Sequence, residues 1–169
     1  MQFINEQLIT KTLYINCDII NKDIDNIIRN ELNNKMENIC NNEGFIIKGS
    51  ISLIKRSIGE IITNNNKSSV KYITTFKCKV ISPCEGDELE SYVHNINKLG
   101  VISYIRLGIK DVEKFEDSPI ISITPNEYFE DSSLNIDDIH IGQLIKIKVI
   151  GTRSKYNSDK IQIVSKPIS

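Results

Sequence analysis

Apolar and polar residues alternate along several short segments of the chain, with the two-residue period of a β-strand that buries one face. This pattern predicts a strand over residues 2–15, in which Leu13 and Ile15 alternate with polar neighbours. The same period predicts three further strands in the first half of the chain, at residues 45–54, 58–63 and 70–81. The polar segment 64–68 between the last two strands is typical of a hairpin turn.

A helical period follows the first strand. Six apolar residues from Ile24 onward recur at spacings of mostly three or four, which places them on one stripe of an α-helix over residues 24–40. Asp23 stands at the N-cap position, and the polar run that ends at Gly44 terminates the helix. The first half of the chain, residues 1–82, is therefore predicted to form a β-α-β-β-β domain.

Five short strands are expected in the second half, residues 83–169, after a turn at Pro83–Asp87. They lie at residues 89–97, 101–107, 120–124, 143–151 and 160–165. Five short strands with one long connection fit a small Greek-key barrel of the OB type. The sequence thus predicts an α+β protein with a C-terminal five-stranded OB-fold β-barrel.

The net charge of −1 conceals an asymmetry between the two halves. Residues 1–82 carry a net charge of +3 and residues 83–169 a net charge of −4, with an acidic segment at 111–138 and a basic tail from residue 143. A dedicated nucleic-acid binder is basic overall, so any nucleic-acid contact is expected from a local patch.

Two groups of residues could form such a patch on the barrel. The basic group is Lys146, Lys148, Arg153, Lys155 and Lys160, and the group that could stack on bases is Tyr92, His94 and Tyr104. The alternative is that the lysines form a solvated face and that the rings pack or lie on the surface. We expect weak, sequence-tolerant contact with single-stranded RNA.

Catalytic and metal-binding patterns are missing from the sequence. The four cysteines form no CxxC pair, neither histidine has zinc-site spacing to them, and no phosphate-binding glycine loop or nucleophile elbow occurs. We therefore expect no cofactor, no metal and no enzymatic activity. We also expect reduced thiols, no secretory signal and no membrane association.

The residues around the expected domain junction are more specific. The segment from Tyr72 to Asp87 resembles the domain junction of the RNA polymerase stalk subunit, the family that comprises the seventh subunit of RNA polymerase II and its archaeal counterpart. In that family an alternating strand leads into a Pro-x-x-Gly-acidic turn, and here Pro83, Gly86 and Asp87 hold those positions. Further similarities to the family occur in the same order along the chain. They lie at Leu13-Tyr14-Ile15, Gly44-Phe45, Ile58-Gly59-Glu60-Ile61 and Leu99-Gly100-Val101.

The resemblance implies an N-terminal RNP-like domain at residues 1–82 that docks on the polymerase core, and an OB-fold domain at residues 83–169 that reaches toward nascent RNA. In many members of the family the protein pairs with a second, smaller stalk subunit. The docking residues on this interpretation are Ser57, Ile58, Gly59, Ile61 and Ile62. Because a proline fixes its φ angle, we expect the junction turn to hold the domains at a set angle.

Two points in the sequence argue against strong RNA binding. Leu99 and Ile102 stand where OB domains that bind RNA more strongly often carry Phe, and the acidic segment 111–117 repels a phosphate backbone. A free-standing OB-fold RNA-binding factor, for example in translation, is the alternative function. The apolar hairpin at Ile58–Ile62 favours the docking subunit, because a free factor does not need it.

The composition bears on the source and the location. The chain has 34 Ile and 18 Asn but no Ala, which suits an AT-rich genome such as that of a large DNA virus or an AT-rich protist. We expect the protein at the site of transcription, in the nucleus of a cell, or in a cytoplasmic virus factory or virion.

Overall fold

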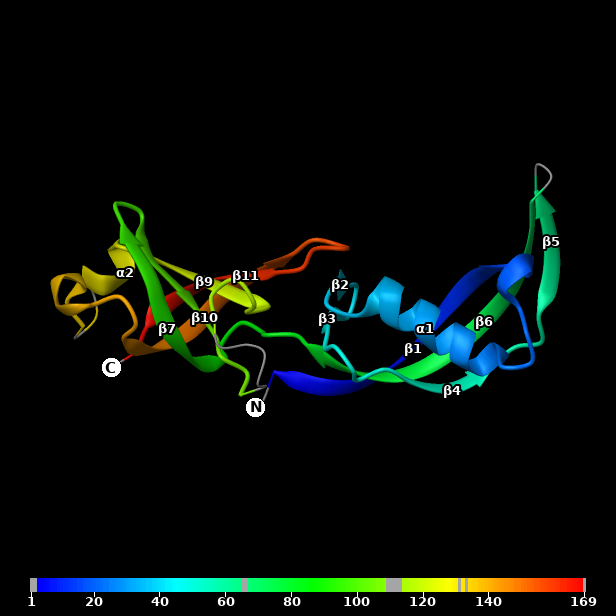
Figure 1. Cartoon of the computed structure of the whole chain (residues 1–169). Helices are drawn as coiled ribbons and strands as arrows, with labels where there is room; N and C mark the ends of the chain where they lie inside the picture. Colours follow the sequence, from blue (N-terminus) through cyan, green and yellow to red (C-terminus); the bar gives the residue numbers. More distant parts are fainter. Residues whose placement is uncertain (1–2, 65–66, 109–113, 131, 133, 169) are drawn as a thin grey trace. The chain divides into compact units, whose positions relative to one another are not determined.

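The computed structural model describes residues 3–64, 67–108, 114–130, 132 and 134–168. Gln2, the centre of the predicted turn at 64–68 and residues 111–113 of the predicted acidic segment lie outside these ranges. The described chain is a mixed α+β protein built mostly of strands, and it divides into two compact units (Figure 1). The sheet unit comprises the described residues of 4–38 and 46–81, and the barrel unit those of 1–3, 39–45 and 82–169.

The longest strand, β6 (Lys67–Ile81), is the centre of the sheet unit (Figure 1). Strand β1 (Ile4–Asn16) runs antiparallel to it along one edge over its whole length. Strands β4 (Ser52–Arg56) and β5 (Glu60–Asn64) pair one after the other with its second edge. The pair β5–β6 is the hairpin that the sequence predicts.

One face of this sheet is covered by the helix α1 (Ile24–Met36). Alternate residues of β1 and β6 point toward it, as the two-residue period requires. The buried core consists of Ile28, Leu32 and Met36 of α1 with Leu13, Ile15, Val70, Tyr72, Phe76, Cys78, Val80 and Ile46. The opposite face of β1 and β6 carries exposed Leu8, Tyr14 and Ile73.

The helix is shorter than predicted. It ends at Met36 instead of residue 40, because Asn38 adopts a left-handed φ of 58° and turns the chain away from the helix axis. The backbone N–H of Asn38 donates to the carbonyl of Ile46 at 2.9 Å. The following residues form a short strand, β2 (Cys40–Asn41), paired with β3 (Gly44–Ile46).

The strand predicted over residues 45–54 is also interrupted. Gly49 has a φ of +73°, and Ser50 donates both its backbone N–H and its hydroxyl to the carbonyl of Ile47. This turn separates β3 from β4. The alternation of apolar residues on both sides of the turn hides the break, because the period alone does not locate a turn of this kind.

The barrel unit contains a closed five-stranded barrel, as predicted. Its strands are β7 (Glu88–Asn97), β8 (Gly100–Tyr104), β9 (Ile120–Pro125), β10 (Leu144–Ser154) and β11 (Ile161–Pro167). The order around the barrel is β7-β8-β9-β11-β10, and β10 pairs back onto β7. Of these pairs only β9–β11 is parallel, and the barrel is OB-like.

The connection between β9 and β10 contains two short helical segments. They are the helix α2 (Glu127–Glu130), whose Phe129 is buried, and a 3-10 turn at Ile136–Asp138. The barrel interior is filled by aliphatic residues of all five strands, among them Leu89, Val101, Ile120, Ile147 and Ile163. Five hydroxyl side chains are buried there as well: Ser91, Ser103, Ser122, Thr124 and Ser165.

Candidate functional site

Residues 57–62, which we call the tip, comprise the connection from β4 to β5 and the first three residues of β5, and they carry two strongly exposed isoleucines. Ile58 is 92% exposed and Ile61 is 74% exposed, whereas Ile62 is half-buried. Ile61 pairs with Val70 and therefore projects from the face of the sheet that carries the core. Ile58 and Ile61 therefore do not fill the core of the sheet unit.

Hydrogen bonds to β6 hold the start of the tip. The backbone N–H of Ser57 donates to the carbonyl of Ile73 at 2.8 Å, and the hydroxyl of Ser57 accepts from the N–H of Ile73 at 2.9 Å. Arg56, the last residue of β4, donates from Nε to Asp25 of α1 and places its guanidinium 5.7 Å from the centre of the Tyr72 ring. The start of the tip is therefore held against β6, and the residue before it is tied to the helix.

Gly59 allows the tip to lie directly on β6. A Cβ atom at this position would be 2.6 Å from Cγ1 of Val70 and 2.9 Å from the ring of Tyr72. Any larger residue would force either the tip backbone or the side chains of Val70 and Tyr72 to move. The close approach places Ile58 in solvent next to a fixed segment of sheet, and such exposed apolar residues often mark a partner surface.

The two predicted tyrosines of the barrel lie side by side on β7 and β8. Tyr92 pairs with Tyr104, and their ring centres are 6.0 Å apart. The guanidinium of Arg106 lies 3.8 Å from the centre of the Tyr92 ring, and its Nη2 donates to the hydroxyl of Tyr104 at 3.0 Å. The geometry is that of a cation–π contact fixed by a hydrogen bond.

His94 belongs to the same group of rings. Its imidazole stacks on the ring of Phe115, with ring centres 3.7 Å apart and an angle of 3° between the planes. The rings of Phe115 and Tyr104 meet in a T-shaped arrangement, with their centres 5.9 Å apart. We call Tyr92, His94, Tyr104, Arg106 and Phe115 the ring cluster.

Sequence reasoning missed two members of this cluster. Arg106 could have been found, because it follows Tyr104 by two residues in a predicted strand and so shares its face. Phe115 had no such signal, since it lies in an acidic segment without periodicity.

The two lysines of β10 share one face of the strand, but they do not stand alone. Lys146 pairs directly with Glu90 of β7, and Lys148 pairs with Glu88. Directly opposed side chains of opposite charge offset each other. The pair β7–β10 is therefore nearly neutral on this face, and it contributes less attraction for phosphate than the two lysines alone would.

The remaining basic residues divide into two groups. Arg153 and Lys155 are exposed at the end of β10 and in the following turn. Lys160 instead donates from Nζ to the backbone carbonyls of Glu116 and Ser118, and more weakly to that of Phe115. Its ammonium group therefore holds the segment that carries Phe115, so we leave Lys160 out of the candidate interface.

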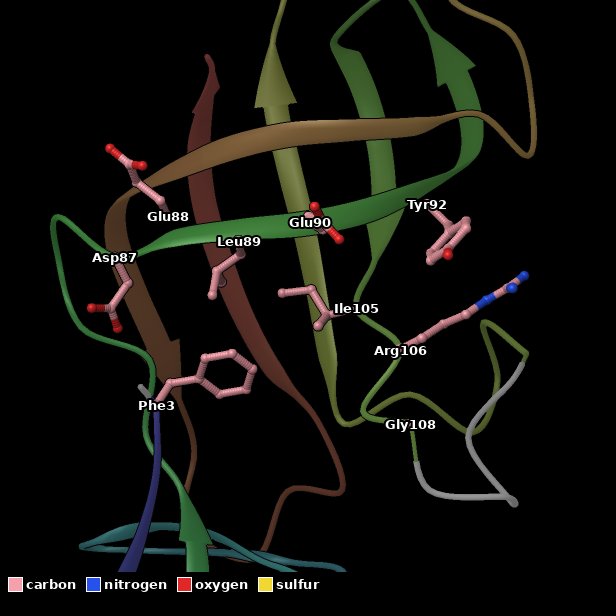
Figure 2. Close-up of a pocket in the computed structure, with 9 residues that line it drawn as sticks. All are labelled: Phe3, Asp87, Glu88, Leu89, Glu90, Tyr92, Ile105, Arg106 and Gly108. Atoms are coloured by element: carbon pink, nitrogen blue, oxygen red, sulfur yellow. The ribbon is translucent and has the colours of Figure 1, made fainter. Parts of the chain in front are cut away.

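A groove of about 520 Å³ lies beside the ring cluster. Figure 2 shows Phe3 below Leu89 and Ile105 in this groove, with Arg106 and Tyr92 together at one end. Asp87, Glu88 and Glu90 line the rest of the rim. These carboxylates disfavour a phosphate backbone along the groove, so an RNA contact would be confined to the end with Arg106.

The predicted junction residues form a closed turn in the barrel unit. Asp87 accepts a hydrogen bond from the N–H of Cys84 at 2.8 Å, and Gly86 has a φ of +94°. The N–H of Gly86 donates to the carbonyl of Val149, and the N–H of Val149 donates to the carbonyl of Asp87. The segment from Pro83 to Asp87 is thus bound to β10. Its effect on the angle between the domains stays a prediction.

The cysteines differ in accessibility. Cys84 is exposed, whereas Cys40 and Cys78 are buried, and all four cysteines are free. Burial raises the pKa of the Cys78 thiol to about 11 and also raises the pKa of Cys40. Within the described ranges, no group of three or more His, Cys, Asp or Glu side chains is placed to hold a metal ion. In the same ranges, no helix has the length and apolar character to cross a bilayer.

No protein-family model matches the chain, and a search of curated proteins finds no significant match.

Proposed function

We propose that the chain is a non-catalytic stalk subunit of a DNA-dependent RNA polymerase. On this proposal the sheet unit is an RNP-like domain that docks on the polymerase core through the tip. The OB-like barrel contacts nascent single-stranded RNA, and a second stalk subunit is a further candidate partner. The protein would act at the site of transcription, in a nucleus, a virus factory or a virion.

The observation that carries this proposal is the exposure of Ile58 and Ile61 on a tip that is held in place. Exposed isoleucines on a free loop could fold back onto the surface, but Ser57 and Gly59 fix this backbone against β6. Holding two large apolar side chains in water is unfavourable unless a partner covers them. The similarity of Ile58-Gly59-Glu60-Ile61 to the tip segment of the stalk family supports the polymerase core as that partner.

The ring cluster supports the RNA part of the proposal. Arg106 supplies a charge and a planar guanidinium, while Tyr92 and His94 present half-buried rings at the barrel surface. Such a site suits a phosphate and at most one or two stacked bases. The acidic rim of the neighbouring groove limits the contact to this end, which fits weak and sequence-tolerant binding.

The docking proposal is tested with single charged substitutions at the tip. Tagged Ile58→Asp and Ile61→Asp proteins are expected to lose most of the polymerase core that the wild-type protein retains in a pull-down from the source cells or virions. Leu8→Asp is the matched control, because Leu8 is 67% exposed on the same unit but lies on the outer face of β1. Circular dichroism confirms that each variant is folded.

Full retention of the core by both folded tip variants would contradict docking through the tip. Loss of the core by the Leu8 variant as well would show that the whole sheet surface, and not the tip, is the contact.

The alternative function is that of a free-standing OB-fold RNA-binding factor, and the ring cluster is the observation that favours it. The two functions differ in the residues they need. Arg106→Gln would weaken the RNA contact of either protein, whereas Ile58→Asp would impair only the stalk subunit and would leave a free factor unaffected. Fluorescence anisotropy with a short single-stranded RNA across a salt series measures the first effect, since phosphate contacts weaken steeply with salt.

A further inference from the structure

The outer surface of the barrel carries an apolar stripe that crosses three neighbouring strands. Ile102 of β8 pairs with Ile123 of β9, and Ile123 pairs with Val164 of β11. Because paired residues share a face, the three side chains form one row, which we call the outer stripe. Ile123 is 37% exposed and Val164 is 40% exposed (strands β9 and β11 in Figure 1).

Polar side chains occupy the inner face behind this stripe. Ser122 and Thr124 flank Ile123 in β9 and point into the barrel, where both hydroxyls lie 2.7 Å from that of Ser165. Ser103, between Ile102 and Tyr104, is buried as well. Burying hydroxyls and leaving isoleucine and valine outside is the reverse of what a lone barrel favours. A surface with this arrangement is explained if a partner covers the outer side.

Basic residues lie on both sides of the outer stripe. Moving along the strands, the next outward residue of β11 on one side is Lys166, which pairs with Lys148 of β10. On the other side of the stripe, the next outward residue of β11 is Gln162, which pairs with Arg153 of β10. Tyr104, the next outward residue of β8 on that side, accepts a hydrogen bond from Arg106. Arg153 and Lys166 are exposed and have no ion-pair partner in the described part of the chain.

We propose that the outer stripe docks an amphipathic protein segment whose aliphatic side chains are flanked by Asp or Glu. The stripe supplies the apolar contact, and Arg153 and Lys166 receive the flanking carboxylates. A second copy of this chain would bring the same basic flanks together, which disfavours it. RNA would suit the flanks, but Ile102, Ile123 and Val164 carry no ring on which a base could stack, and Tyr104, the next outward residue of β8, is only 8% exposed.

Fluorescence anisotropy of the full chain with two labelled peptides tests this proposal. One is an amphipathic helical peptide with leucines on one face and glutamates beside them, and the other carries lysines in place of the glutamates. We expect the acidic peptide to bind about tenfold more tightly than the basic one, because like charges across an interface repel. The double substitution Arg153→Glu and Lys166→Glu should reverse this preference.

The apolar part is tested by Ile123→Gln, with Ile141→Gln as the matched control on the exposed loop before β10. Only the Ile123 variant should weaken binding of the acidic peptide. Equal binding of both peptides, or no change in preference with the reversed charges, would overturn the proposal. So would a short polyuridine RNA that binds the wild-type protein and is released by Ile123→Gln, since the stripe would then be an RNA site. The result does not depend on whether the tip docks on a polymerase.

Discussion

Gly59 lies where the tip backbone crosses the side chains of Val70 and Tyr72. A Cβ at this position would be 2.6 Å from Val70, and β-branched valine has little freedom to move away. The position of the tip backbone against β6 therefore depends on the absence of a side chain at Gly59.

Gly59→Ala is expected to lower the free energy of unfolding by about 1–3 kcal/mol, as other overpacked substitutions do. Urea denaturation measures the change. Gly151→Ala is the control, because a Cβ at Gly151 would meet nothing within 4 Å. Equal stability of both variants would show that the tip does not lie against β6.

Cys78 shows how burial of one thiol makes stability depend on pH. Burial raises the pKa of the Cys78 thiol to about 11. The pKa of a cysteine thiol in an unfolded chain is about 8.5. Between these values the unfolded state has lost a proton that the native state keeps. The stabilisation from Cys78 is thus fully present below about pH 8.5 and is lost as the pH rises toward 11.

Over this range the free energy of unfolding should fall by up to about 1.4 kcal/mol per pH unit on account of Cys78. The Cys78→Ala protein should be less stable at neutral pH but should show a shallower decline. Urea denaturation of both proteins between about pH 8 and 11 measures the difference. Parallel declines would contradict a buried, neutral Cys78 thiol.

At the scale of single elements, the end of α1 depends on the backbone of Asn38. The hydrophobic period predicts a helix over residues 24–40, and it locates the start of α1 correctly at Ile24. The end is set by the left-handed φ of Asn38 and its hydrogen bond to Ile46, which no periodicity encodes. An asparagine in an Asn-rich chain gives little warning of such a turn.

Asn38→Gly should leave stability nearly unchanged, because glycine adopts a left-handed backbone freely. Asn38→Val should cost about 1–2 kcal/mol, the usual penalty for this conformation. Thermal unfolding followed by circular dichroism compares the two variants. A valine variant as stable as the glycine variant would mean that the helix continues through residue 38.

Strand pairing places carboxylates opposite two of the predicted basic residues, which the local sequence pattern does not indicate. Alternation correctly places Lys146 and Lys148 on one face of β10. The register of β10 on β7, which sets Glu90 and Glu88 opposite them, joins residues far apart in the chain. The local pattern of residues does not predict that pairing. For the same reason it does not predict that Lys160 donates to backbone carbonyls more than 40 residues away in the chain.

At the scale of the whole molecule, the α+β class and the closed five-stranded barrel follow from the sequence. They could be predicted because the strands are short, regular and separated by clear turn residues, and the connection after β9 is long. The RNP-like character of the sheet unit and the stalk function stay predictions. They depend on short similarities in order along the chain, such as the Pro83–Asp87 turn.

The outer stripe could not be predicted for a physical reason. In β9 isoleucines alternate with hydroxyl residues, and the simplest interpretation places the isoleucines inside. The structure has Ile121 and Ile123 on the outer side and Ser122 and Thr124 buried. A shift of β9 by one residue would exchange its two faces, and the hydrophobic period alone does not exclude that shift.

We propose contact between the tip of this protein and a polymerase core, and site-specific cross-linking detects such a contact at a single residue. A photo-reactive amino acid replaces Ile58 in the protein expressed in its source, and the cross-linked peptides are identified by mass spectrometry. Cross-links from Ile58 to large subunits of an RNA polymerase are the expected result, with none from the same probe at Leu8. Cross-links to ribosomal or other non-polymerase proteins from a folded chain would contradict the account.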